Sequence, residues 1–132
     1  MPDNDNKLNL NVLIVDDNQI NKLLLKKILD KWGVLSEFAD DGKQAVEKIT
    51  NNQSYDVVLM DIYMPEMSGT DATRTIREKS APYFQNLPII ALTASMMTAE
   101  INEIEASGMN DYIIKPFDTQ LLFDKLSSYQ KV

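Results

Sequence analysis

Short apolar runs alternate with stretches of helical periodicity along most of the chain. Each run has the length of a strand, and the five runs cover residues 12–15, 34–38, 57–60, 89–92 and 112–114. Most of them are continuously apolar, as expected for parallel strands whose two faces are both covered by helices. The pattern therefore predicts five β–α units, with a five-stranded parallel sheet and five helices.

Residues with capping chemistry mark the ends of the predicted helices. The starts fall near Asn18, after Asp41 and at Asp118, and glycines at positions 33 and 108 mark two helix ends. Gln44 follows Asp41 by three residues, as in a capping box. The segment that holds Pro82 and Pro88 is predicted to be a loop.

The apolar positions also predict which helix faces are buried. In the first helix, Ile20, Leu24 and Ile28 recur at i, i+4 spacing with Leu23 beside them, which predicts one apolar stripe against the sheet.

Alternating strands and helices place the chain in the α/β class. Right-handed crossovers and the chain length suit a single doubly wound domain with strand order 2-1-3-4-5, an order adopted from known folds rather than derived from the residues. We expect this domain to span residues 10–132, and residues 1–9 to form a flexible N-terminal arm or linker.

Composition excludes several kinds of function. The 132 residues carry a net charge of −7, with 13 basic against 20 acidic residues, so direct nucleic-acid binding is not expected. Without cysteine or histidine, the chain has no thiolate or imidazole metal site and no histidine that could carry a phosphoryl group. No apolar run approaches the roughly 20 residues of a membrane span.

Polar residues end four of the five predicted strands. They are Asp16 and Asp17, Asp61, Thr93 and Lys115. In an open parallel sheet, ligands bind at the carboxyl ends of the strands, beside the point where strand order reverses. The predicted order places the first and third strands at that point, so the three aspartates are expected to converge, with Thr93 and Lys115 beside them.

Three converging carboxylates repel one another unless they take up protons or hold a cation. A divalent ion with oxygen ligands relieves the repulsion, and Mg²⁺ leaves room for a phosphate oxygen. The ion, the Lys115 ammonium and the Thr93 hydroxyl would each bind one oxygen of a phosphoryl group on Asp61. The residues therefore predict a carboxylate that accepts a phosphoryl group.

Four segments resemble the receiver domain of two-component response regulators. They are VLIVDDNQIN (12–21), VVLMDIYMPEMSG (57–69), IIALTAS (89–95) and DYIIKPF (111–117). The residues of these motifs are most similar to those in receivers of hybrid sensor histidine kinases. Ser68 stands where the family often has Asp before the glycine, and Ser caps the following helix comparably.

The resemblance implies a role for each matching residue. Asp61 would be the phosphoacceptor, and Asp17 and Asp61 would bind Mg²⁺ directly with the backbone carbonyl of Tyr63, while Asp16 would act mostly through water. Lys115 and Thr93 would contact the phosphoryl group, and Tyr112 would change its burial when Thr93 moves.

The resemblance also implies features around the site. Lys115-Pro116 is expected to be a cis peptide. Tyr63 and Ser95 border the acceptor and should tune the lifetime of the phosphoryl group.

The implied function is a phosphorylation switch in a phosphorelay. The donor would be a phosphohistidine of a histidine kinase or phosphotransfer protein. The downstream partner would bind the face formed by the fourth helix, fifth strand and fifth helix. The expected location is the cytoplasm, or the cytoplasmic part of a membrane sensor kinase.

Three alternatives compete with this interpretation. A phosphohydrolase with an aspartyl-phosphate intermediate usually has a second Asp two residues after the nucleophile, where this chain has Tyr63. A flavodoxin-like carrier would need a phosphate cradle after the first strand, where this chain has DDNQIN. A receiver-like interaction module without phosphorylation would not need the complete set of Asp, Thr and Lys.

Overall fold

The protein folds around a five-stranded parallel sheet with strand order β2-β1-β3-β4-β5, as the sequence predicts. A computed structural model describes residues 7–94, 97–115 and 118–130. Its strands are β1 (Asn11–Val15), β2 (Leu35–Ala39), β3 (Val57–Asp61), β4 (Ile89–Thr93) and β5 (Asp111–Ile114). Strand order reverses around β1, which pairs with β2 on one side and β3 on the other.

Six helices connect and follow these strands within the described ranges, where the sequence predicts five. They are α1 (Gln19–Lys31), α2 (Gly42–Asn51), α3 (Gly69–Arg77), α4 (Pro82–Asn86), α5 (Thr98–Ser107) and α6 (Thr119–Ser127). The predicted fourth and fifth helices are therefore α5 and α6 of the structure. None of the helices in these ranges is long and apolar enough to cross a bilayer.

The additional helix, α4, lies where the prolines predict a loop. Pro82 occupies a first-turn position of this helix, where its fixed φ angle suits the helix and its missing N–H costs nothing. Phe84 is buried in the core, and the guanidinium of Arg77 donates to the Phe84 carbonyl at 2.9 Å. A proline expected to break structure thus begins a short helix that is stabilised by tertiary contacts.

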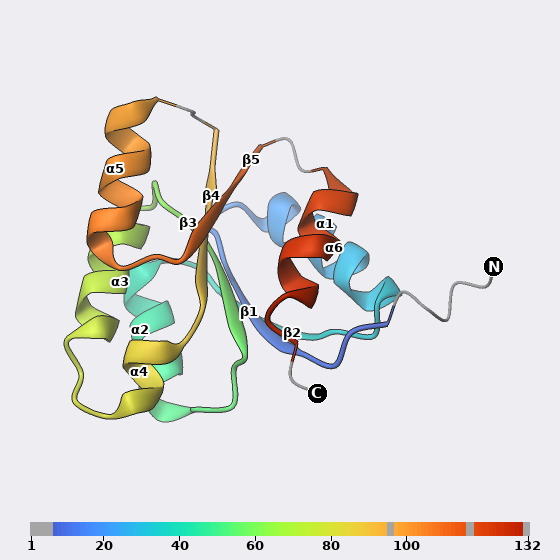
Figure 1. The fold of residues 1–132 in the computed structure, drawn as a ribbon, viewed down its shortest axis with the longest axis horizontal. Helices are drawn as coiled ribbons and strands as arrows, with labels where there is room; N and C mark the ends of the chain where they lie inside the picture. Colours follow the sequence, from blue (N-terminus) through green and yellow to red (C-terminus); the bar gives the residue numbers. More distant parts are fainter. Residues whose placement is uncertain (1–6, 95–96, 116–117, 131–132) are drawn as a thin grey trace.

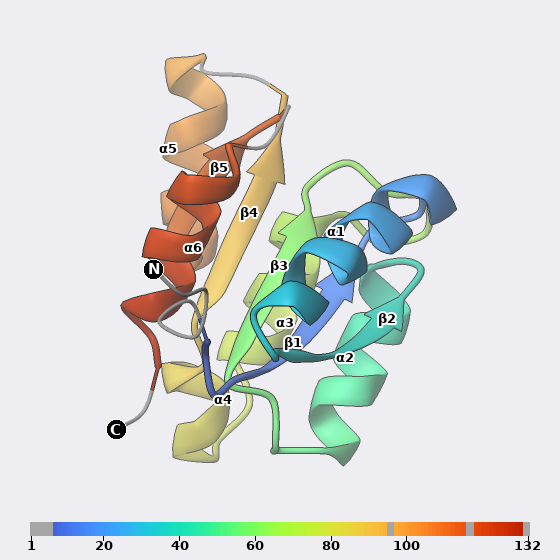
Figure 2. The same ribbon diagram turned by 90° about the vertical axis from the view of Figure 1, so that its right-hand side faces the viewer.

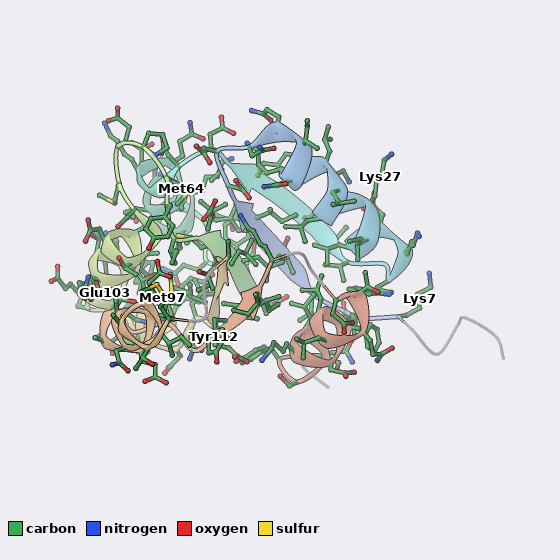
Figure 3. The ribbon with its side chains drawn as sticks, turned by 90° about the horizontal axis from the view of Figure 1, so that it is seen from above. Lys7, Lys27, Met64, Met97, Glu103 and Tyr112 are labelled. Atoms are coloured by element: carbon green, nitrogen blue, oxygen red, sulfur yellow. The ribbon has the colours of Figure 1, made fainter. Side chains whose placement is uncertain are left out.

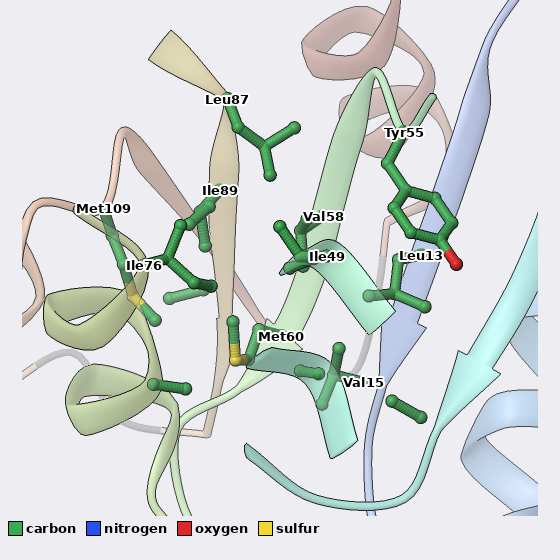
Figure 4. Close-up of a cluster of buried hydrophobic side chains, with 14 of the residues drawn as sticks. Leu13, Val15, Ile49, Tyr55, Val58, Met60, Ile76, Leu87, Ile89 and Met109 are labelled. Carbon is green, nitrogen blue, oxygen red and sulfur yellow. The ribbon is translucent and has the colours of Figure 1, made fainter. Parts of the chain in front are cut away.

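The helices cover both faces of the sheet, with α2, α3, α4 and α5 on one side and α1 and α6 on the other (Figures 1 and 2). Alternate residues of each central strand enter different cores. Val58 and Met60 of β3 pack toward α2 and α3, in the cluster shown in Figure 4, whereas Val57 and Leu59 pack toward α1 and α6. Burial on both faces explains why these strands are continuously apolar.

The predicted caps are confirmed. The side chains of Asn18, Asp41 and Asp118 accept hydrogen bonds from backbone N–H groups in the first turns of α1, α2 and α6. Gly33, which follows the C-cap of α1, and Gly108, the C-cap of α5, have φ angles of 75° and 101°, which favour glycine.

The predicted buried stripe of α1 is wrong for three of its four residues. The residues that face the sheet are Lys22, Leu25 and Leu29, whereas Ile20 is 76% exposed and Leu24 is 50% exposed. Leu23 is exposed as well, and only Ile28 of the predicted stripe packs, partly buried, against the core. The buried face includes a lysine whose ammonium pairs with Asp40, a partner that the hydrophobic pattern cannot indicate.

Candidate functional site

Asp16, Asp17 and Asp61 converge at the carboxyl edge of the sheet. Val15 of β1 is paired with Met60 of β3, so the residues that follow them in the two strands lie side by side. One carboxylate oxygen from each of the three aspartates lies within 4.8 Å of the others. Asp16 and Asp61 are buried, whereas Asp17 is exposed. The convergence predicted from the strand ends is confirmed.

Hydrogen bonds from the start of α1 fix the orientation of Asp16. Its Oδ1 accepts from the backbone N–H of Asn18 at 2.9 Å, and its Oδ2 accepts from the Asn21 amide at 3.3 Å. The backbone N–H of Asp16 donates to Ala39 at the end of β2. Asp16 is therefore held by the protein, while the exposed Asp17 is accessible to an ion.

Lys115 is the cation of the site. Its Nζ lies 3.4 Å from Asp61 Oδ2 and 3.7 Å from Asp16 Oδ2. Its backbone N–H donates to the Thr93 carbonyl at 2.7 Å, which fixes Lys115 to the end of β4. One ammonium thus faces two of the three carboxylates.

The carboxylates of the site carry more negative charge than its one ammonium neutralises. Burial raises the pKa of Asp61 to about 6, the charge of Lys115 opposes the rise, and Asp16 and Asp17 add to it. Three carboxylates face one ammonium, so Lys115 alone does not compensate the clustered negative charge. Oxygen donors at this spacing, one of them exposed, fit a hard divalent ion such as Mg²⁺.

The loop from β3 to α3 passes very close to the acceptor strand. The backbone N–H of Tyr63 donates to Asp61 Oδ1 at 3.1 Å, and that of Gly69 donates to the Ile62 carbonyl at 3.0 Å. A Cβ on Gly69 would lie 2.3 Å from the Asp61 carbonyl oxygen, so only glycine fits. Ser68 caps α3, as predicted for this variant of the motif. Gly69 ends the MPEMSG segment, and a glycine at this position is the sequence feature that indicates the close approach. No role was predicted for it from the sequence.

Thr93 and Tyr112 lie on the two neighbouring strands β4 and β5. Thr93 is buried at the end of β4, one residue beyond Leu92, which pairs with Asp61. Tyr112 on β5 is half-buried and packs against the core cluster on the α5 side. Pro116 and Ser95, for which the sequence predicts a cis peptide and a position beside the acceptor, lie outside the described residues.

Two features near the site were not predicted. Tyr63 is 64% exposed, and its hydroxyl donates to Glu100 on α5. Ile20, Leu23 and Leu24 form an exposed apolar face on α1, which begins two residues after Asp17. The i, i+4 spacing of apolar residues in α1 is the sequence feature that marks this exposed face, but these residues were predicted to be buried.

Comparison with protein families gives one match over most of the chain. The model of the response regulator receiver domain matches residues 12–127. A relative named hybrid signal transduction histidine kinase I, from Dictyostelium discoideum, is 40% identical over 121 residues, which are 89% of this chain and 7% of the relative. The signal transduction histidine-protein kinase BarA of Escherichia coli K12 is 36% identical over 126 residues, 96% of this chain and 13% of the relative. The chain thus spans a small part of these curated relatives.

Solved structures show the same fold. The receiver domain of sensor histidine kinase PA1611 from Pseudomonas aeruginosa, with a magnesium ion in its active-site cleft, has a TM-score of 0.83 and 34% identity, with 91% of this chain and 96% of that chain covered. The receiver domain of Saccharomyces cerevisiae Ssk1, crystallised with the phosphotransfer protein Ypd1, also has a TM-score of 0.83. It is 30% identical, and the match covers 94% of this chain and 90% of that chain.

Proposed function

Because the chain belongs to the response regulator receiver domain family and is a receiver of the phosphorelay type, we propose that Asp61 is its phosphoacceptor. The observation that carries this assignment is the position of Asp61 between two carboxylates and one ammonium, at the carboxyl edge of the sheet. Asp61 is buried, but its side chain is still 12% exposed, so a molecule from solvent can reach its carboxylate.

Mg²⁺ is the proposed cofactor, held by Asp17 and Asp61 with the Tyr63 backbone carbonyl, and through water by Asp16. The oxygen donor set and the unbalanced negative charge support this proposal. The similar receiver domain from P. aeruginosa has magnesium in its cleft. When bound, the ion supplies positive charge that neutralises phosphoryl oxygens.

The proposed reaction moves a phosphoryl group from a phosphohistidine to Asp61. An Asp61 oxygen forms the new P–O bond as the P–N bond breaks, and the electron pair of that bond leaves with the donor imidazole. Lys115, already 3.4 Å from Asp61, is placed to bind a phosphoryl oxygen, and Thr93 would donate its hydroxyl to another. The 132 residues contain no histidine, so the donor imidazole lies outside them.

The proposed donor is a histidine kinase or phosphotransfer protein. The relatives are histidine kinases, and the similar Ssk1 receiver was crystallised with a phosphotransfer protein. The exposed apolar face of α1, which consists of Ile20, Leu23 and Leu24, offers contact area beside the site for such a donor.

The proposed response is a change at the face formed by α5, β5 and α6. Movement of Thr93 toward the phosphoryl group would shift the start of α5, and half-buried Tyr112 on β5 would follow inward. The phosphoryl oxygens provide the contacts that distinguish the two states, which any ligand-driven shift requires. A downstream partner would bind this face in one state in preference to the other.

We further propose that the chain is a signalling domain without turnover of a separate substrate, and that it acts in the cytoplasm. The exposed ring of Tyr63 occupies the position where a phosphohydrolase of the aspartyl-phosphate class would carry its acid. The proposed domain spans residues 10–132, preceded by an arm at residues 1–9. Leu8 contradicts the expected flexibility at the end of that arm, because it is buried in the core and donates its N–H to the Trp32 carbonyl.

Radiolabelled acetyl phosphate tests the acceptor assignment. The protein should be labelled in the presence of Mg²⁺, and Asp61→Asn should abolish the labelling. Asp71→Asn is a matched control, because Asp71 is an exposed carboxylate on α3 outside the site. Undiminished labelling of Asp61→Asn would refute the assignment.

A further inference from the structure

Lys22 is a lysine of α1 whose side chain is buried. It is only 1% exposed, whereas Figure 3 shows Lys27 of the same helix pointing away from the sheet. The Lys22 ammonium pairs with the carboxylate of Asp40, which follows β2, and lies 5.7 Å from the centre of the Phe38 ring. A buried ion pair adds little net stability compared with an apolar side chain of similar size. What this pair does contribute is a fixed position of α1 relative to the end of β2.

Asp40 is itself held in place by its neighbours in the chain. Its backbone N–H donates to Oε1 of Gln44 in α2 at 3.0 Å, and the backbone N–H of Gln44 donates to Asp41 Oδ1 at 2.8 Å. On the other side, Ala39 is paired with Val15 in the sheet. Asp40 is therefore a fixed anchor for the ammonium, although its own side chain is 51% exposed.

Asp16 lies between the two elements that this ion pair joins. Its backbone N–H donates to the carbonyl of Ala39 at 3.2 Å, at the end of β2. Its carboxylate accepts from the backbone N–H of Asn18 at 2.9 Å and from the Asn21 amide at 3.3 Å, at the start of α1. Lys22 belongs to the same turn, because its backbone N–H donates to the Asn18 carbonyl. The orientation of Asp16 thus depends on how the first turn of α1 is placed beside β2.

We propose that Lys22 is a positioning residue for Asp16, and that it acts by holding the first turn of α1 against the end of β2. This inference rests on the proposed function, in which Asp16 contributes to the Mg²⁺ site through water. Without the ion pair, the first turn of α1 gains freedom to move, and its hydrogen bonds to the Asp16 carboxylate no longer fix one orientation. The Mg²⁺ site is then less well ordered before the ion binds, and the ion binds more weakly.

The positive charge of Lys22 separates positioning from simple electrostatics. Lys22→Met removes a cation from the surroundings of three carboxylates, so the loss of repulsion alone would strengthen Mg²⁺ binding. Loss of positioning weakens it instead. Lys26→Met is the matched control, because Lys26 lies one turn further along α1 and pairs with Asp30 of the same helix at 3.1 Å. Its substitution removes the same charge without breaking a link between α1 and β2.

The test measures the dissociation constant for Mg²⁺ by isothermal titration calorimetry, at about 0.15 M salt so that charges beyond roughly 8 Å are screened. Lys22→Met should raise the constant about three- to tenfold, less than the loss typical of a group that contacts a metal ligand directly. Lys26→Met should leave it unchanged or slightly lower. Asp40→Glu should retain most of the affinity, because its carboxylate still accepts the ammonium. The double variant of Lys22→Met with Asp40→Asn should match Lys22→Met, because both substitutions break the same pair.

An unchanged or lower dissociation constant for Lys22→Met would overturn the inference, as would an equal rise in Lys26→Met. The unaltered protein separates this outcome from failure of the proposed function. If it binds no Mg²⁺, the proposed metal site is rejected, whereas normal binding that Lys22→Met leaves intact rejects only the role of Lys22. Urea unfolding shows whether each variant is folded. If Lys22→Met is not, Asp40→Asn decides by the same criterion against Glu47→Gln, which removes an equal charge from an exposed position of α2.

Discussion

Lys115 reaches across the end of β4 to place its Nζ 3.4 Å from Asp61 Oδ2 on β3. Neighbouring strands lie about 4.8 Å apart, so the side chain crosses two strand spacings from β5 to the acceptor. A long, flexible, cationic side chain suits the proposed reaction, in which Lys115 would turn from the carboxylate to an oxygen of the phosphoryl group.

Lys115→Met should lower the rate of labelling by acetyl phosphate at least about tenfold, because it removes a charge-assisted contact to the phosphoryl oxygens while keeping the side-chain bulk. Lys125→Met is the matched control, since Lys125 pairs with Asp111 at 2.8 Å outside the carboxylate group. Labelling of Lys115→Met at the rate of the control would contradict the role of Lys115.

Asp17→Asn should raise the dissociation constant for Mg²⁺ at least about tenfold, because Asp17 is the exposed carboxylate of the group and a direct ligand in the proposed site. Isothermal titration calorimetry measures the constant. Removal of the metal with EDTA should also stop labelling of the unaltered protein. Unchanged Mg²⁺ affinity in Asp17→Asn would show that the ion binds elsewhere.

Gly69→Ala should destabilise the protein by about 2–4 kcal/mol, because the new Cβ would lie 2.3 Å from the Asp61 carbonyl oxygen and force the backbone apart. Gly33→Ala should cost about 1 kcal/mol, since its φ of 75° disfavours alanine but its nearest neighbour is 3.6 Å away. Urea unfolding gives both values, and equal losses would contradict the close approach at Gly69.

Lys22 and Asp40 should respond asymmetrically to substitution. Asp40→Asn leaves the buried ammonium of Lys22 without its carboxylate and should cost about 1–3 kcal/mol, whereas Lys22→Met removes the buried charge and should be nearly neutral. Urea unfolding at neutral pH measures both changes.

The same pair makes a prediction about pH. The hydrogen bond from Lys22 lowers the pKa of Asp40 below its ordinary value of 3.8. The stabilisation is therefore complete at neutral pH and is lost as the pH falls through the lowered pKa. The difference between Asp40→Asn and the unaltered protein should shrink below about pH 4, and a constant difference into strong acid would contradict the pairing.

The sequence predicted the sheet, its order and the convergence of the three aspartates, because continuous apolar runs and polar strand ends follow directly from burial. It failed where tertiary contacts override local pattern. Most of the predicted apolar stripe of α1 is exposed, and Lys22 lies on the buried face, since Asp40 accepts its ammonium. Pro82 begins α4 rather than a loop, because Arg77 and the core hold Phe84. The bond between Tyr63 and Glu100 joins residues 37 positions apart and has no local signal.

Chemical trapping of the phosphorylated residue tests the central claim most directly. The protein is treated with acetyl phosphate and Mg²⁺ and then with sodium borohydride, which reduces an aspartyl phosphate to homoserine, and the peptides are mapped by mass spectrometry. The account predicts homoserine at position 61 and at no other aspartate. Homoserine at Asp16, Asp17 or another aspartate, with Asp61 unmodified, would contradict it.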